Sequence, residues 1–166
     1  MSDIPTLRTP RLLLRPPEMR DFEAYSGLMR SERSRFMGGP FDETRAWGLF
    51  CHDIACWDLF GHGALMVDIE EASICVGQVG INHGPLFPEK ELGWLIYDGF
   101  EGQGYATEAA AALLNWAFKQ AEIGTLVSYF DPLNHRSIAV ARRLGGRLDP
   151  DAPRHDPEDI VYRYDR

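Results

Sequence analysis

The stretch from Gly99 to Phe118 constrains the fold more than any other and reads GFEGQGYATEAAAALLNWAF. Three glycines within six residues precede an alanine-rich run, which predicts a helix over roughly residues 104–122. The first backbone N–H groups of a helix have no intrahelical partner, and glycine brings no Cβ, so such a turn can bind an anion. The glycines could equally serve only a tight strand-to-helix connection, and their spacing leaves both interpretations open.

Two common phosphate-binding motifs do not fit this turn. A P-loop requires Gly-Lys-Ser/Thr, whereas Tyr105 and Ala106 follow Gly104. A dinucleotide-binding fingerprint requires Gly or Ala three residues after Gly104, where Thr107 stands, and its acidic residue is poorly matched by the distant Asp131. The turn therefore belongs to neither class.

Length and composition indicate one globular domain. The chain has 166 residues, and its formal net charge of −8 argues against a nucleic-acid partner, because phosphate backbones are bound by clustered Lys and Arg. The three cysteines have no zinc-ligand or disulfide-framework spacing, so we expect no metal and a reducing, cytoplasmic environment. No apolar run is long enough to cross a membrane, and we expect no membrane partner.

The pattern of apolar residues predicts a mixed α/β order. A strand over 11–17 is followed by a helix beginning near Glu18 and by another that Asp42 caps and that extends to about Phe60. Its stripe of Trp47, Phe50, Ile54 and Trp57 is typical of a buried core. Later strands are expected over 64–69, 74–82, 91–97, 125–130 and 159–165, with a helix over 134–146.

Several segments in sequence resemble one family. EGQGYA, from Glu101, is similar to the Q/R-x-x-G-x-G/A signature of the GNAT superfamily of acyl-CoA-dependent N-acyltransferases, and GQGYATEA resembles its RimJ/RimL-type branch of ribosomal-protein N-terminal acetyltransferases. TPRLLLRPPEMRDFEAY, KELGWLI, NHRSIAVARRLGG and DIVYRY are similar to other segments of that branch, in the same order. The resemblance covers essentially the whole chain.

This resemblance implies a single GNAT-like α/β (α+β) domain over residues 1–166. Its mixed central sheet would have about six to seven strands, of which the fourth and fifth splay apart, and about four helices would flank it. The arm of acetyl-CoA, the expected co-substrate, would lie in the gap between the splayed strands.

The resemblance also places the coenzyme. Its pantetheine arm would bond the backbone of Leu95, Ile96 and Tyr97 and the side chain of Asn134. Its pyrophosphate would rest on backbone N–H groups of Gly102, Gln103, Gly104, Tyr105 and Ala106, with the hydroxyl of Thr107 as a further donor. Thr107 could instead be an ordinary helix-start residue, and Asn134 an ordinary N-cap.

Glu101 departs from the family pattern, which usually has Gln or Arg at this position. A carboxylate repels a pyrophosphate of like charge. Because the backbone would make the principal contacts, we expect the Glu101 side chain to point into solvent. Weaker coenzyme affinity is the alternative.

Ser137 and Glu91 are the predicted catalytic residues. Within the resemblance, the Ser137 hydroxyl would protonate the departing thiolate, because Ala141 occupies the place where many members carry a tyrosine. Glu91 is the candidate base for the attacking amine, with His83 as a second candidate. Glu91 could also be a solvated residue at a strand end, and Ser137 an ordinary residue in the first turn of a helix.

The sequence thus predicts an N-acetyltransferase that moves the acetyl group of acetyl-CoA to a primary amine by direct attack. The acceptor could be a protein N-terminus or a small molecule, bound near the first two helices, residues 35–41 and Trp47. The alternatives are a non-catalytic acyl-CoA-binding module of the same fold and a nucleotide-binding regulatory domain. We expect a monomer or homodimer.

Overall fold

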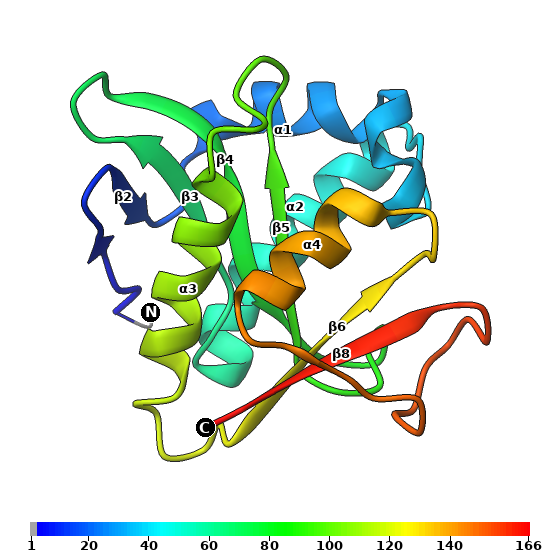
Figure 1. The fold of residues 1–166 in the computed structure, drawn as a ribbon. Coiled ribbons are helices and arrows are strands. Elements are labelled where there is room, and N and C mark those ends of the chain that lie inside the picture. Colours follow the sequence, from blue (N-terminus) through cyan, green and yellow to red (C-terminus); the bar gives the residue numbers. More distant parts are fainter. Residues whose placement is uncertain (1–2) are drawn as a thin grey trace.

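An eight-stranded mixed sheet forms the centre of the molecule in the computed structural model, which describes residues 3–166 (Figure 1). The strand order is β1-β2-β3-β4-β5-β6-β8-β7, and every neighbouring pair is antiparallel except β5 and β6. The strands are β1 (Leu7–Arg8), β2 (Leu12–Arg15), β3 (Ala64–Ile69), β4 (Ile74–Asn82), β5 (Glu91–Ile96), β6 (Thr125–Phe130), β7 (Arg147–Leu148) and β8 (Ile160–Asp165). The predicted fold is confirmed, and the two-residue strands β1 and β7 are additions to it.

Helices cover both faces of the sheet. α3 (Tyr105–Ala117) and α4 (His135–Arg143) lie on the front face in Figure 1, with α1 (Phe22–Met29) and α2 (Glu43–Phe60) behind. Two 3-10 helices, η1 (Met19–Asp21) and η2 (Glu32–Met37), flank α1. The predicted cap of α2 is present, since the Asp42 carboxylate accepts the N–H of Arg45 at 2.7 Å. α3 is shorter than predicted, because short turns replace helical hydrogen bonding after Ala117.

Strands β5 and β6, the fourth and fifth of the family pattern, splay apart. They pair at a single register position, Glu91 with Val127, and the carbonyl of Leu92 then accepts the hydroxyl of Ser128 at 2.5 Å. Beyond that point no β5–β6 pairing is present within residues 3–166. The predicted gap in the sheet is thus confirmed.

Two apolar clusters hold the layers together. Small residues on α3, including Ala109, Ala110 and Ala117, are buried against the strands and let this helix pack closely on the sheet. Behind the sheet, Tyr25 and Phe50 are buried with parts of β3 and β5. Trp47 is 43% exposed, contrary to the expected core stripe, because it lies at the outer edge of α2 against Phe22.

None of the helices that lie within residues 3–166 combines the length and apolarity needed to cross a bilayer.

Candidate active site

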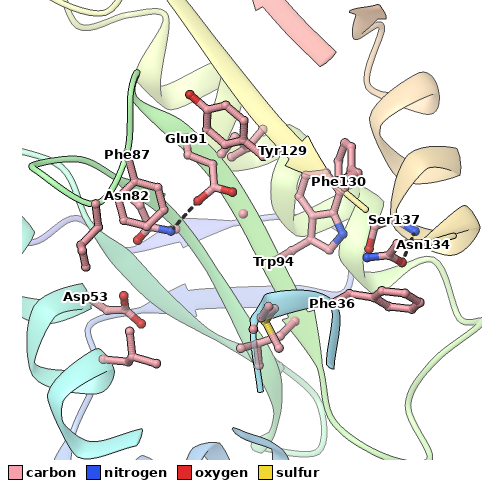
Figure 2. A pocket seen from close by; sticks show the side chains of 18 of the residues that line it. Phe36, Asp53, Asn82, Phe87, Glu91, Trp94, Tyr129, Phe130, Asn134 and Ser137 are labelled. Carbon is pink, nitrogen blue, oxygen red and sulfur yellow. Dashed lines mark hydrogen bonds between the residues drawn. The ribbon is translucent and has the colours of Figure 1, made fainter. Parts of the chain in front are cut away.

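A cavity of about 500 Å³ opens at the gap between β5 and β6. η2, α2, β4 and α4 complete its walls, so both faces of the sheet contribute to it. Glu91, Asn134 and Ser137 line this cavity together, as Figure 2 shows. The structure therefore brings the two predicted catalytic side chains to one site.

Glu91 begins β5 and lines the cavity. Its carboxylate accepts the side-chain N–H of Asn82 at 3.0 Å (Figure 2). Burial raises the pKa of Glu91 to about 7, although the hydrogen bond from Asn82 opposes that rise. A carboxylate with such a pKa can accept and release a proton near neutral pH.

Asp53 is a second carboxylate of the cavity, and it was not predicted from the sequence. It extends from α2 toward the region of Asn82 and Glu91 (Figure 2) and is only 9% exposed. The Tyr25 hydroxyl donates to it at 3.2 Å, and burial raises its pKa to about 7. One signal was available, because Asp53 lies at helical spacing between Phe50 and Trp57, on the apolar side of α2.

His83, the second candidate base, lies away from the cavity lining. Its ring packs against the rings of Phe60 and His62, with centroid separations of 5.0 and 6.1 Å. The structure therefore does not bring it together with Glu91.

Asn134 and Ser137 lie at the start of α4, on the side of the cavity opposite Glu91 (Figure 2). The Asn134 side chain accepts the backbone N–H of Ser137 at 3.4 Å and so caps the helix. Between them and Glu91 lie Trp94 and Phe130, whose ring centroids are 5.9 Å apart. The Ser137 hydroxyl is partly buried and available to the cavity.

The glycine turn has the backbone of an anion site. Gly102 and Gly104 have φ of 75° and 81°, conformations that favour glycine, and Gly104 is the N-cap of α3. Among the described residues, no backbone N–H from position 102 to 107 donates to a turn, loop or side-chain acceptor. The Thr107 hydroxyl lies in the same first turn. These free donors fit a diphosphate.

Arg11 holds the turn from the β2 side. It donates to the carbonyl of Gln103 at 2.9 Å, pairs with Glu108 at 2.7 Å and lies 4.8 Å from the centre of the Tyr105 ring. The turn is therefore fixed by a neighbouring element while its N–H groups stay free.

The backbone of β5 presents alternate residues to the gap. The N–H of Tyr97 donates to the Val76 carbonyl in β4 at 2.8 Å, and strand alternation directs the backbone groups of Leu95, two residues earlier, to the same side. The carbonyls of Leu92 and Ile96 instead point to the other side, away from β4. By strand alternation, the backbone groups of Trp94 and Ile96 therefore face the gap. Of the three expected backbone contacts, Ile96 is placed for one, whereas Leu95 and Tyr97 are turned toward β4.

Glu101 does not point into solvent, contrary to expectation. Its carboxylate pairs with Arg33 at 2.8 Å and accepts the N–H of Gly99 at 2.8 Å, and its side chain is 29% exposed. The reason is an arginine from η2, far away in sequence, which compensates the negative charge.

A splayed mixed sheet with a glycine turn after β5 and carboxylates in the adjoining cavity is the arrangement expected of an acyl-CoA-dependent acyltransferase. The family model described as an acetyltransferase (GNAT) domain matches residues 11–147. The chain therefore belongs to the GNAT family and is an acetyl-CoA-dependent N-acetyltransferase. No group of three or more His, Cys, Asp or Glu side chains suited to a metal ion occurs within residues 3–166.

Known proteins with the same fold include acetyltransferases of the RimL type. The acetyltransferase of Agrobacterium tumefaciens strain C58 is 62% identical, with a TM-score of 0.96 over 100% of this chain and 97% of that chain. Protein YkkB of Bacillus subtilis is 28% identical over 150 residues, which span 84% of this chain and 83% of YkkB. RimL, a ribosomal L7/L12 alpha-N-protein acetyltransferase solved with coenzyme A, shares the fold at 17% identity, with a TM-score of 0.77 over 97% and 98% of the two chains.

Proposed function

We propose that this enzyme transfers the acetyl group of acetyl-CoA directly to a primary amine bound at the end of the cavity where Asp53 and Glu91 lie. One observation carries the proposal: both carboxylates line the same cavity as Ser137, across the gap between β5 and β6. An amine arrives mostly as an ammonium ion, and two buried carboxylates favour its entry.

The acceptor must lose a proton before it attacks. Glu91, with a pKa of about 7, takes this proton directly or through a water. The amine nitrogen then forms a bond to the thioester carbonyl carbon. The nitrogen of the tetrahedral intermediate releases its second proton to water, and the carbon–sulfur bond breaks to give the amide and the thiolate. The leaving thiolate receives a proton from the Ser137 hydroxyl, which regains one from solvent.

Free backbone groups would hold the coenzyme. Its diphosphate would bind the N–H groups of residues 102–106 with the Thr107 hydroxyl, at the positive end of α3. Its arm would bond the gap-facing backbone of Trp94 and Ile96 and the side chain of Asn134. The thioester would then lie between Ser137 and the carboxylates.

The acceptor amine belongs to one of two chemical classes. The name of RimL describes an N-terminal protein acetyltransferase, which favours a protein N-terminus, and a small-molecule amine is the alternative. An uncompensated carboxylate at Glu101 would favour the non-catalytic module, and this support is weakened because Arg33 pairs with Glu101.

The test is release of the coenzyme thiol from acetyl-CoA in the presence of amines. The panel contains short peptides with free N-termini, the same peptides with blocked N-termini, and small-molecule amines. We expect calorimetry to show acetyl-CoA binding and turnover to occur only with free amines, at a rate that rises through about pH 7. Binding without turnover on any amine would favour the non-catalytic module, and turnover independent of pH between 6 and 8 would contradict the role of Glu91.

A further inference from the structure

Arg33 connects η2 to the loop that carries the coenzyme turn. Its Nη1 lies 2.8 Å from the Glu101 carboxylate and 2.5 Å from that of Asp98, and its Nη2 donates to the Ile96 carbonyl at 2.9 Å. We call these four residues the Arg33 cluster. One guanidinium therefore contacts the end of β5 and both acidic residues that precede the free N–H groups of the turn.

The charges of the Arg33 cluster conflict with the proposed ligand unless Arg33 is present. Asp98 and Glu101 carry two negative charges, and the diphosphate of acyl-CoA would bind next to them. Arg33 cancels one of these charges at contact distance. Across the turn, Arg11 is already paired with Glu108, so that pair leaves little net charge.

We propose that Arg33 is the counter-ion that allows this turn to accept the diphosphate of acyl-CoA although Glu101 stands in it. The inference rests on the coenzyme placement given above. Arg33 is a positioning residue: it acts through Glu101 and the turn, and does not take part in acetyl transfer.

The geometry allows Arg33 to keep this role when the coenzyme arm binds. Its contact with the Ile96 carbonyl is made by Nη2, whereas Nη1 makes both ion pairs. The arm can therefore replace the former contact without breaking the latter.

Calorimetry with coenzyme A tests the proposal without knowledge of the acceptor. Arg33→Gln should weaken coenzyme A binding about tenfold, because two carboxylates then repel the diphosphate. Arg33→Lys should retain most of the affinity. Glu101→Gln should tighten binding a few-fold, and the double variant Arg33→Gln/Glu101→Gln should recover most of the loss.

The matched control is Arg30→Gln, which removes an exposed arginine three residues earlier, 3.9 Å from Glu43 and outside the Arg33 cluster. It should bind coenzyme A like the wild type. Pantetheine, which lacks the diphosphate, is the second probe, and Arg33→Gln should not weaken its binding, because the substitution only frees the Ile96 carbonyl for the arm. Thermal melts establish that each variant is folded. If Arg33→Gln does not fold, the predicted tightening of coenzyme A binding by Glu101→Gln still tests the proposal.

Equal or tighter binding of coenzyme A by Arg33→Gln would overturn the proposal, since it would mean that Arg33 merely blocks Ile96. Equal losses for coenzyme A and pantetheine, or no recovery in the double variant, would also overturn it. Failure of the wild type to bind coenzyme A at all would instead contradict the coenzyme placement, and with it the proposed function.

Discussion

The two proposed binding sites, called here the coenzyme end and the acceptor end, are built in different ways. The proposed coenzyme end consists of backbone: free N–H groups after Gly104 and the gap-facing edge of β5. The proposed acceptor end consists of side chains from separate elements, with Glu91 from β5 and Asp53 from α2. A backbone site leaves a local sequence motif, because glycine spacing and helix start determine it. A side-chain site assembled by the fold leaves no such motif.

The largest expected effect is at the acceptor end. Glu91→Gln keeps the shape of the side chain but removes the proton acceptor, so kcat should fall by about a thousandfold at pH 7. Wild-type activity should show an ionisation near pH 7, as the carboxyl loses its proton, whereas activity of the variant should follow only the fraction of neutral acceptor amine. The measurement is thiol release over pH 5.5–9 with an acceptor from the amine panel.

Coenzyme A affinity should be unchanged in Glu91→Gln, because Glu91 is at the other end of the cavity. Glu89→Gln is the matched control: its carboxylate pairs with Arg163 at 2.8 Å and does not line the cavity. It can lower stability but should retain the pH dependence. A Glu91→Gln enzyme with wild-type kcat would show that the acceptor end does not supply the catalytic base.

The coenzyme end should show the reverse pattern. Gly104→Val places a β-branched residue at φ 81°, with its Cβ 3.4 Å from Arg11, and should displace the free N–H groups. We expect coenzyme A affinity to fall by about a hundredfold, as measured by calorimetry.

Gly145→Val is the control variant for the effect of backbone strain alone. Gly145 also has φ 81°, follows α4 and has open space around it. Both variants should melt at lower temperature by similar amounts, yet only Gly104→Val should lose affinity. Equal affinities in the two variants would show that the turn does not hold the coenzyme.

Local signals explain how much of the fold was predictable. Period-two apolar runs, the Asp42 cap and the glycine turn each specify their own element, and the structure confirms those elements. β1 and β7 were missed because two residues are too few for a periodic pattern. α3 was predicted too long because nothing in residues 118–122 forbids a helix, and the short turns there form only in the folded chain.

The site residues were predictable only where they belong to a local sequence motif or to a segment that resembles the family. Glu91 and Ser137 were named from family segments, and the fold brings both to one cavity. Arg33 and Asp53 were not named, because the importance of each depends on a partner far away in the sequence. Arg33 contacts Ile96, 63 residues away, and Asp53 accepts a hydrogen bond from Tyr25, 28 residues away. The wrong prediction for Glu101 has the same origin. Its neighbours in sequence do not include Arg33, which only the fold brings next to its carboxylate.

Ser137 lies between the two ends and should give an intermediate result. Ser137→Ala removes a proton donor for the leaving thiolate, and kcat should fall about tenfold while coenzyme A affinity changes less than twofold. The loss should grow as pH falls below the pKa of the coenzyme thiol, where protonation of the leaving group matters most. Activity equal to wild type at every pH would exclude Ser137 from the reaction.

The smallest effect concerns stability at the acceptor end. Burial raises the pKa of Asp53 from 3.8 to about 7, so the folded state holds a proton that the unfolded chain releases at lower pH. Stability from this residue is therefore complete below about pH 4 and is lost as pH rises toward 7. Asp53→Asn cannot titrate, so its melting temperature should decline less than that of the wild type, by about 5 °C less between pH 5 and pH 8. Tyr25→Phe removes the hydroxyl that donates to Asp53 and should make the wild-type decline steeper. If wild type and Asp53→Asn declined in parallel, Asp53 would not be the buried carboxyl that distinguishes the acceptor end from the backbone-built coenzyme end.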